Sequence, residues 1–142
     1  MADRNSEKIG EENAMKKTKL LNRDISFLIA DLGHTDVIVI ADSGFPVPPG
    51  VRKIDLALTE GVPGFLETVR VVLSELCVEK VWVADEMAAR SAHVRERLLE
   101  LVGDAAVESL PHEEFKAVTA KKALAVIRTG ECTPYCNLML QA

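Results

Sequence analysis

Hydrophobic residues occur along the chain in short blocks whose spacing changes repeatedly between that of a strand and that of a helix. Alternating or continuous apolar runs predict strands at residues 37–41, 54–58, 81–84, 107–110, 124–127 and 138–140. Apolar residues at three- and four-residue spacing predict helices at residues 22–33, 63–76, 85–101 and 111–120. Strands that alternate with helices form a mostly parallel or mixed sheet between two helical layers, so the pattern predicts a three-layer α/β/α domain.

Residues 1–15 do not follow this pattern. They are charged and polar, with few apolar side chains to bury. A segment of this kind gains too little from burial to offset the entropy that is lost on ordering. The sequence therefore predicts a disordered polar tail at residues 1–15 and one folded domain at residues 16–142.

Composition narrows the class of protein. The 142 residues carry a net charge of -5, and the lysines and arginines form no cluster of the kind that binds nucleic acid. No stretch approaches the roughly 20 apolar residues of a membrane-spanning helix, and the polar N-terminus is unlike a signal peptide. Three cysteines at irregular spacing are typical of free thiols in a reducing compartment. We therefore expect a cytoplasmic protein that binds neither nucleic acid nor membranes.

Several common functional motifs are absent from the sequence. It contains none of the glycine-rich motifs that bind nucleotides and no serine motif of the acyl hydrolases. The histidines, His34, His93 and His112, are far apart. Cys132 and Cys136 lack the second pair of ligands that a zinc site of this type requires. We therefore expect no metal site.

Polar residues follow three of the predicted strands at the point where each strand ends. Asp42, Asp85 and the segment 128–131 each come directly after one of these strands. Ligands of open α/β sheets bind beside the carboxyl ends of the strands. The sequence therefore predicts a polar pocket at this edge of the sheet.

Two residues near the first predicted strand are candidates for chemistry. His34 follows Gly33, where the first helix is expected to end, and a histidine can donate and accept a proton near neutral pH. An exposed residue that caps the helix is the alternative for His34. Asp42 suits a carboxylate partner or an acceptor for sugar hydroxyls, or it forms a turn. His93 is assigned to an exposed helix face without function.

Two further pairs carry polar groups suited to a ligand. His112 and Lys116 are four residues apart and share one helical face, as they also would in an ordinary amphipathic helix. Tyr135 and Asn137 point to the same side if the chain is extended there, and hydroxyl and amide groups suit a polyhydroxylated sugar. A surface loop is the alternative for the second pair.

Longer segments that contain these candidates resemble the ribose pyranase and fucose mutarotase family. The segments that carry the resemblance are residues 31–36, 41–48, 53–58, 111–116 and 125–137. A Gly-His step and a Tyr-x-Asn element are common to both branches, whereas the loop Gly44–Pro48 and the Thr133–Pro134 step favour the ribose branch. The resemblance extends from about Met15 to the end of the chain.

The resemblance implies an isomerase that interconverts the pyranose and furanose rings of β-D-ribose by general acid/base ring opening and reclosure, without metal or cofactor. It implies that His34 is the proton donor. The residues that it implies for sugar binding are Asp42, His112, Lys116, Tyr135 and Asn137. The alternatives are a mutarotase of another sugar such as L-fucose and a non-catalytic sugar-binding accessory protein.

The resemblance also implies a homo-oligomer built from pentameric rings, paired into decamers, with sites at the contacts between subunits. The partners of the chain are then D-ribose and further copies of the chain itself. Tyr135 and Asn137 lie near the chain end, in a position suited to reaching a neighbour. We therefore expect His34 and Tyr135 of one site to come from different chains.

Overall fold

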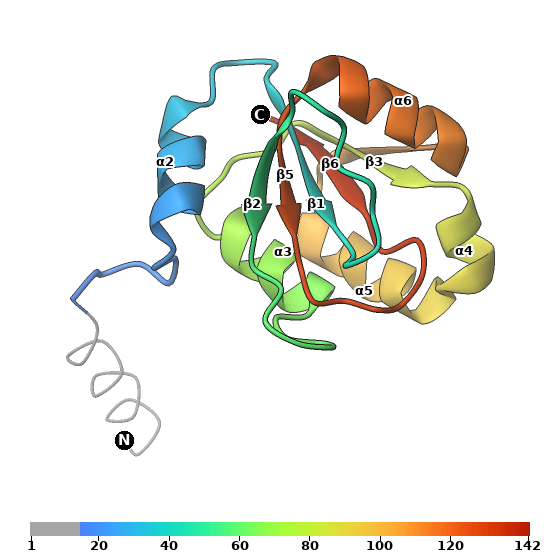
Figure 1. Ribbon diagram of the computed structural model, residues 1–142, viewed down its shortest axis with the longest axis horizontal. Helices are drawn as coiled ribbons and strands as arrows, with labels where there is room; N and C mark the ends of the chain where they lie inside the picture. The colour runs from blue at the N-terminus through green and yellow to red at the C-terminus, as the bar shows by residue number, and fades with distance from the viewer. Residues whose placement is uncertain (1–14) are drawn as a thin grey trace.

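The computed structural model of the chain describes residues 15–142 (Figure 1). Of the tail predicted at residues 1–15, only Met15 lies within the described residues. The strands are β1 (Val37–Ala41), β2 (Arg52–Asp55), β3 (Lys80–Ala84), β4 (Ala106–Leu110), β5 (Ala123–Arg128) and β6 (Leu138–Gln141). The helices are α2 (Arg23–Asp31), α3 (Phe65–Leu73), α4 (Glu86–Arg90), α5 (Ala92–Val102) and α6 (His112–Lys122). The strand order in the sheet is β2-β5-β1-β6-β3-β4.

The sheet is mixed, because one strand runs against its neighbours. β1 is parallel to β5, β5 to β2, and β3 to β4, whereas β6 is antiparallel to both β1 and β3. The connection from β5 to β6 spans only residues 129–137. A parallel crossover needs about a dozen residues or more, so this short loop returns the chain in the opposite direction. The start of β6 therefore lies beside the end of β1, where Ile40 pairs with Leu138.

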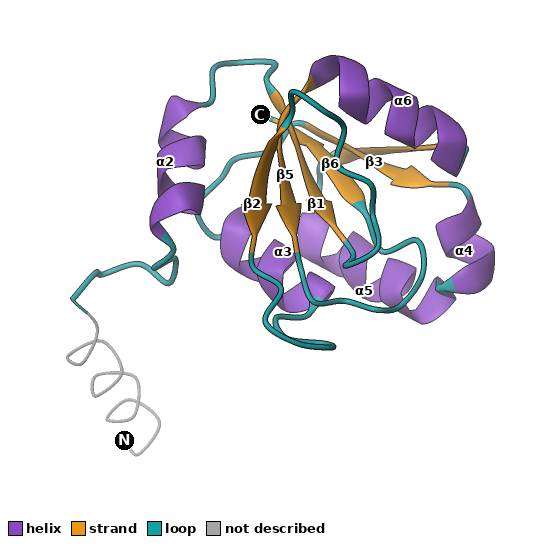
Figure 2. Cartoon of the chain, in the orientation of Figure 1, coloured by secondary structure: helices purple, strands orange, loops and turns teal. Residues whose placement is uncertain are grey.

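Helices cover both faces of the sheet (Figure 2), which confirms the predicted three-layer architecture. All residues of β1 are buried, and they face the two sides in alternation, as the period of a strand requires. Ile38 and Ile40 belong to the core formed with α2, α3 and α5. Val39 belongs to the core formed with Phe115 of α6. The central strand is thus a rigid base for the residues that follow it.

The helix predicted at residues 85–101 is in fact two helices. α4 ends at Arg90 and α5 begins at Ala92, with Ser91 between them in a non-helical conformation (φ -144°, ψ 45°). The side chain of Ser91 is wholly buried, and its hydroxyl donates to the carbonyl oxygen of Pro134. A contact with a distant part of the chain therefore accompanies the break, and local apolar spacing does not reveal it.

The strand predicted at residues 54–58 lies earlier, at Arg52–Asp55. β2 is at the edge of the sheet and all of its residues except Ile54 are exposed. Apolar alternation marks buried side chains, so it does not detect the polar residues of an edge strand. Leu56 still donates its N–H to the carbonyl of Arg128 at 2.9 Å before the chain leaves the sheet.

The first helix begins as predicted but ends earlier. Oδ1 of Asn22 accepts the backbone N–H of Ile25 at 2.9 Å, so Asn22 caps the start of the helix. α2 ends before it reaches Gly33. The N–H of Gly33 donates to Oδ2 of Asp36 at 2.7 Å. A turn held by an aspartate therefore follows the helix, and this turn carries His34.

Candidate functional site

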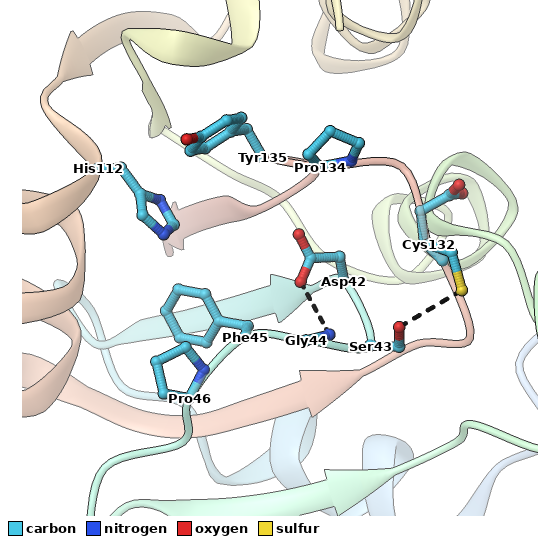
Figure 3. Close-up of a pocket in the computed structure, with 10 residues that line it drawn as sticks. Asp42, Ser43, Gly44, Phe45, Pro46, His112, Cys132, Pro134 and Tyr135 are labelled. Atoms are coloured by element: carbon cyan, nitrogen blue, oxygen red, sulfur yellow. Dashed lines mark hydrogen bonds between the residues drawn. The ribbon is translucent and has the colours of Figure 1, made fainter. Parts of the chain in front are cut away.

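A pocket with a volume of about 280 Å³ opens beside the carboxyl end of β1 (Figure 3). The residues that line it are Asp42, Ser43, Gly44, Phe45, Pro46, His112, Glu131, Cys132, Pro134 and Tyr135. They belong to the loop after β1, the start of α6, and the loop between β5 and β6. The polar pocket expected at this edge of the sheet is therefore present.

Asp42 is the buried acidic group of the pocket. Its backbone N–H donates to Oδ1 of Asn137 at 2.9 Å, and Nδ2 of Asn137 lies 3.4 Å from its Oδ2. The N–H of Gly44 donates to its Oδ1 at 3.1 Å. Burial raises the pKa of Asp42, and the hydrogen bonds from Gly44 and Asn137 offset this effect only in part. A carboxylate that is poorly solvated in this way is a good acceptor for ligand hydroxyls.

Three aromatic rings form one wall of the pocket. The centroids of the His112 and Tyr135 rings are 5.1 Å apart, and the rings are nearly perpendicular at 87°. Phe45 meets His112 edge-on, with 6.1 Å between centroids. Nδ1 of His112 is buried and has no hydrogen-bond partner among residues 15–142. Buried polar atoms are normally hydrogen-bonded, so this unpaired nitrogen is an exception within the wall.

Glu131 fastens the loop between β5 and β6 to helix α3. Its Oε1 accepts the backbone N–H of Phe65, the first residue of α3, at 3.0 Å. Its Oε2 accepts the hydroxyl of Thr133 at 2.8 Å. Partial burial acts to raise the pKa of Glu131, but the hydrogen bonds from Phe65 and Thr133 outweigh it and the pKa is lowered. The ionised carboxylate also lies at a helix N-terminus, where negative charge is stabilising.

The structure brings four of the predicted site residues together. Asp42, His112 and Tyr135 line the pocket. Asn137 is wholly buried and lies behind Asp42, to which it is hydrogen-bonded. The chain is not extended at Tyr135, which corrects the premise on which Tyr135 and Asn137 were paired: its main chain lies in the left-handed region with φ 61°, a conformation that non-glycine residues rarely adopt.

Lys116 and His93 lie outside the residues that line the pocket. Nζ of Lys116 forms an ion pair with Oε1 of Glu113, one turn earlier in α6, at 2.8 Å. His93 is exposed on α5, as expected from the sequence. The helical face that Lys116 and His112 were expected to share thus brings only His112 to the pocket.

His34 lies at the other end of the strands, just before the amino end of β1. Its side chain is 74% exposed, and its Nε2 is 3.9 Å from Oε1 of Glu79, which precedes β3. The next residue, Thr35, donates its N–H to the carbonyl of Ala142, which follows β6. Asp42 instead follows β1, whose five residues span about 16 Å at ~3.3 Å per residue. Within one chain, His34 is therefore remote from the pocket.

Several pocket residues were not singled out from the sequence as candidates. They are Ser43, Phe45, Cys132 and Pro134. The available signal is position, because two of them follow Asp42 closely and the other two precede Tyr135. Composition alone does not separate them from ordinary loop residues.

Two features are absent from the described part of the chain. Residues 15–142 contain no group of three or more histidine, cysteine, aspartate or glutamate side chains arranged to hold a metal ion. The same residues include no helix with the length and apolar content that crossing a membrane requires.

Comparison with known proteins gives close relatives over most of the chain. The D-ribose pyranase of Coprothermobacter proteolyticus is 52% identical over 128 residues, which cover 90% of this chain and 97% of the relative. The D-ribose pyranase of Vibrio cholerae is 52% identical over 136 residues, with the same coverage of 90% and 97%.

Solved structures agree with these relatives. The structure of Bacillus subtilis RbsD complexed with D-ribose matches with a TM-score of 0.86 and 52% identity, covering 90% of this chain and 97% of that one. The fucose mutarotase of Streptococcus pneumoniae in complex with L-fucose has a TM-score of 0.69 and 19% identity, covering 84% and 91%, which shows a shared fold. The model of the RbsD / FucU transport protein family matches residues 15–142. The chain therefore belongs to the RbsD / FucU family.

Proposed function

We propose that the chain is a D-ribose pyranase, an isomerase that interconverts β-D-ribopyranose and β-D-ribofuranose. The observation that carries this proposal is the ribose-bound relative, which has 52% identity and a TM-score of 0.86 over 90% of the chain. D-ribose pyranases from other organisms are equally similar. The pocket beside β1 has the polar and aromatic lining that a small sugar requires.

Sugar binding is assigned to the residues around Asp42. Its buried carboxylate accepts hydroxyl hydrogens, and the imidazole of His112 lines the same pocket. The ring of Tyr135 provides an apolar face beside a hydroxyl. Asn137 orients Asp42 through its hydrogen bonds, and it requires a local opening to contact the sugar itself, because it is wholly buried. Lys116 requires a change of side-chain direction to join them, because it is paired with Glu113.

The reaction needs proton transfer and little else. Opening the pyranose breaks the bond between C1 and the ring oxygen, so the C1 hydroxyl loses a proton and the ring oxygen gains one. After rotation of the open chain, the C4 hydroxyl adds to C1 and loses its proton, while the C1 oxygen is protonated. Protons balance over the cycle, and we assign His34 as the donor. General acid–base catalysis of this kind raises the reaction rate by about 10²–10⁴-fold.

His34 acts in this scheme on the pocket of a neighbouring copy. It is remote from the pocket of its own chain, and its exposed side chain is free to face another subunit. A second hollow of about 350 Å³ adjoins the pocket, with Ser43 and Cys132 in both walls. Leu58, which is 80% exposed, lines this hollow. We place the proposed subunit contact beside this exposed side chain.

We extend the proposal to assembly, location and domain limits. The assembly is a pentameric ring, and two rings pair into a decamer. The compartment is the cytoplasm, where free cysteines are stable. The catalytic domain comprises residues 16–142, in line with the family match over residues 15–142. Deletion of residues 1–14 is then expected to leave the exchange rate unchanged.

Saturation-transfer NMR on sugar solutions tests the proposed function. The protein should accelerate exchange between the ribopyranose and ribofuranose signals, with EDTA present and with excess ribose. Faster exchange of L-fucose anomers than of ribose forms would instead identify a mutarotase of that sugar. Broadened ribose signals without faster exchange would identify a non-catalytic binding protein. Loss of activity on adding EDTA would contradict the cofactor-free mechanism.

A further inference from the structure

The short helix α4 contacts both sides of the pocket through residues at its two ends. Glu86 is its first residue, and the carboxylate accepts the backbone N–H of His112 with Oε1 at 3.0 Å and Oε2 at 3.2 Å. Ser91 directly follows its last residue, and the hydroxyl donates to the carbonyl oxygen of Pro134, next to Tyr135. Neither Glu86 nor Ser91 lines the pocket.

Glu86 supplies a cap that helix α6 lacks. Pro111 occupies the N-cap position of α6 and makes no side-chain capping bond. The first N–H groups of a helix need acceptors from outside the helix, and a carboxylate there also complements the helix dipole. Glu86 meets both needs at the N–H of His112 itself. It therefore fixes the backbone that carries the imidazole.

Ser91 gives its hydroxyl to the pocket loop rather than to its own helix. It occupies the N-cap position of α5, where a serine oxygen ordinarily accepts an N–H of the first turn. No such capping bond is formed. The side chain is wholly buried and donates to Pro134 instead. This use of the hydroxyl explains why a serine interrupts the helical pattern at this point.

The bond from Ser91 acts on the peptide group that precedes Tyr135. The orientation of this Pro134–Tyr135 peptide plane sets φ of Tyr135, which is 61°. A tyrosine holds such a conformation only when the surrounding structure constrains it. Besides the bond from Ser91, the carbonyl of Pro134 has the buried thiol of Cys136 at 3.8 Å. The hydroxyl of Ser91 is thus the main constraint on this carbonyl.

We propose that Glu86 and Ser91 are positioning residues, and that α4 uses them to set the 5.1 Å separation between the His112 and Tyr135 rings. The kinetic consequence of this inference rests on the proposed ribose pyranase function. The geometric consequence does not, because it concerns the ring of Tyr135 in the protein without sugar.

Fluorine NMR tests the geometric consequence. Tyr135 is the single tyrosine of the chain, so 3-fluorotyrosine gives one ¹⁹F signal from the full-length protein. Ser91→Ala should shift or broaden this signal. The matched control is Thr68→Val, which removes a buried hydroxyl that donates to the carbonyl of Gly64 at 2.8 Å in α3. An unchanged signal in Ser91→Ala, or an equal change in both variants, would overturn the role of Ser91. Ser91→Cys serves if the alanine variant does not fold.

Ribose exchange kinetics test the functional consequence in the same variants. Ser91→Ala should lower kcat/KM by about tenfold or more, because misplacement by ~1 Å can cost ~10²-fold. Thr68→Val should stay within about twofold at a temperature where both variants are folded. Glu86→Gln keeps an acceptor for the His112 N–H and should retain more activity than Glu86→Ala. Equal losses in Ser91→Ala and Thr68→Val would show that Ser91 has a purely structural role. Equal losses in Glu86→Gln and Glu86→Ala would show the same for Glu86.

Failure of the wild-type protein to exchange ribose would count against the proposed function alone. The ¹⁹F comparison would then still decide whether Ser91 holds Tyr135. Conversely, an active wild type whose Ser91→Ala variant keeps full kcat/KM would overturn the positioning role while leaving the proposed function intact.

Discussion

His34 and Asp42 lie beyond opposite ends of the same buried strand, β1. β6 runs antiparallel beside β1, so the residues before and after β6 lie next to the two ends of β1. At one end Asn137 is bonded to Asp42, and at the other Ala142 accepts the N–H of Thr35. A proton donor and a sugar-binding carboxylate at these positions can act on one ligand only if two chains meet.

Mixing of inactive variants tests the shared site. We expect His34→Ala and Tyr135→Ala proteins to be nearly inactive alone and to recover activity when unfolded and refolded together. A site is intact when the His34→Ala chain supplies the pocket and its neighbour supplies His34, so about a quarter of sites should recover in a cyclic ring. Ribose exchange measured by NMR, with mixed oligomers confirmed by mass spectrometry, gives the result.

The control for this mixture uses two residues of one pocket. His112 and Tyr135 contact each other within a chain, at 5.1 Å between centroids. A mixture of His112→Ala and Tyr135→Ala chains therefore contains no intact pocket and should stay inactive. The shared site would be rejected if confirmed mixed oligomers of the His34 pair were no more active than this control.

Replacement of His34 should affect rate more than binding. Proton transfer matters in the transition state, so His34→Ala should lower kcat by about 10²–10⁴-fold while the ribose dissociation constant rises much less. NMR exchange gives the rate and a ribose titration gives the affinity. The exposed His93 provides the control, and His93→Ala should retain normal values of both. Equal loss of rate and affinity in His34→Ala would indicate a binding residue only.

The buried parts of the fold could be predicted from the sequence, and the connections between distant segments could not. Ile38 and Ile40 face one side of β1 and Val39 faces the other. Because helices cover both sides, all three residues are apolar, and this continuous apolar run is visible in the sequence. The break at Ser91 depends instead on Pro134, 43 residues further along the chain. The spacing of apolar residues within one helix does not indicate a contact with a segment so far along the chain.

In the candidate site, too, local sequence indicates some residues, whereas contacts between distant segments are not predictable from it. Asp42 could be placed at a pocket because a residue that directly follows a buried parallel strand lies at the ligand-binding edge. The pairing of His112 with Tyr135 depends on the return of the chain through residues 129–137, which the pattern of apolar residues does not fix. The family resemblance pointed to both residues, and the fold supplies the reason that they meet.

The stability of the protein should depend on pH through Asp42. Burial raises its pKa above the ordinary value of 3.8, so the folded protein binds this proton more tightly than the unfolded chain. The resulting stabilisation is complete below the ordinary value and is lost as pH rises through the folded-state pKa. Relative to Asp42→Asn, the wild type should therefore gain unfolding free energy as pH falls from 7 toward 3.8. Urea unfolding at several pH values gives the difference, and a difference that is constant with pH would contradict this assignment.

The cysteines should differ in reactivity, and ribose should protect one of them. Burial raises the pKa of Cys136 to about 12, so its thiol stays protonated and shielded near neutral pH. Cys77 and Cys132 are exposed, and Cys132 lines the pocket. A thiol reagent should therefore modify two sites in the folded protein, and saturating D-ribose should slow only the modification of Cys132. In Cys132→Ser protein, labelling of Cys77 should not respond to ribose. Peptide mass spectrometry identifies the sites, and ribose-independent labelling of Cys132 would place the sugar elsewhere.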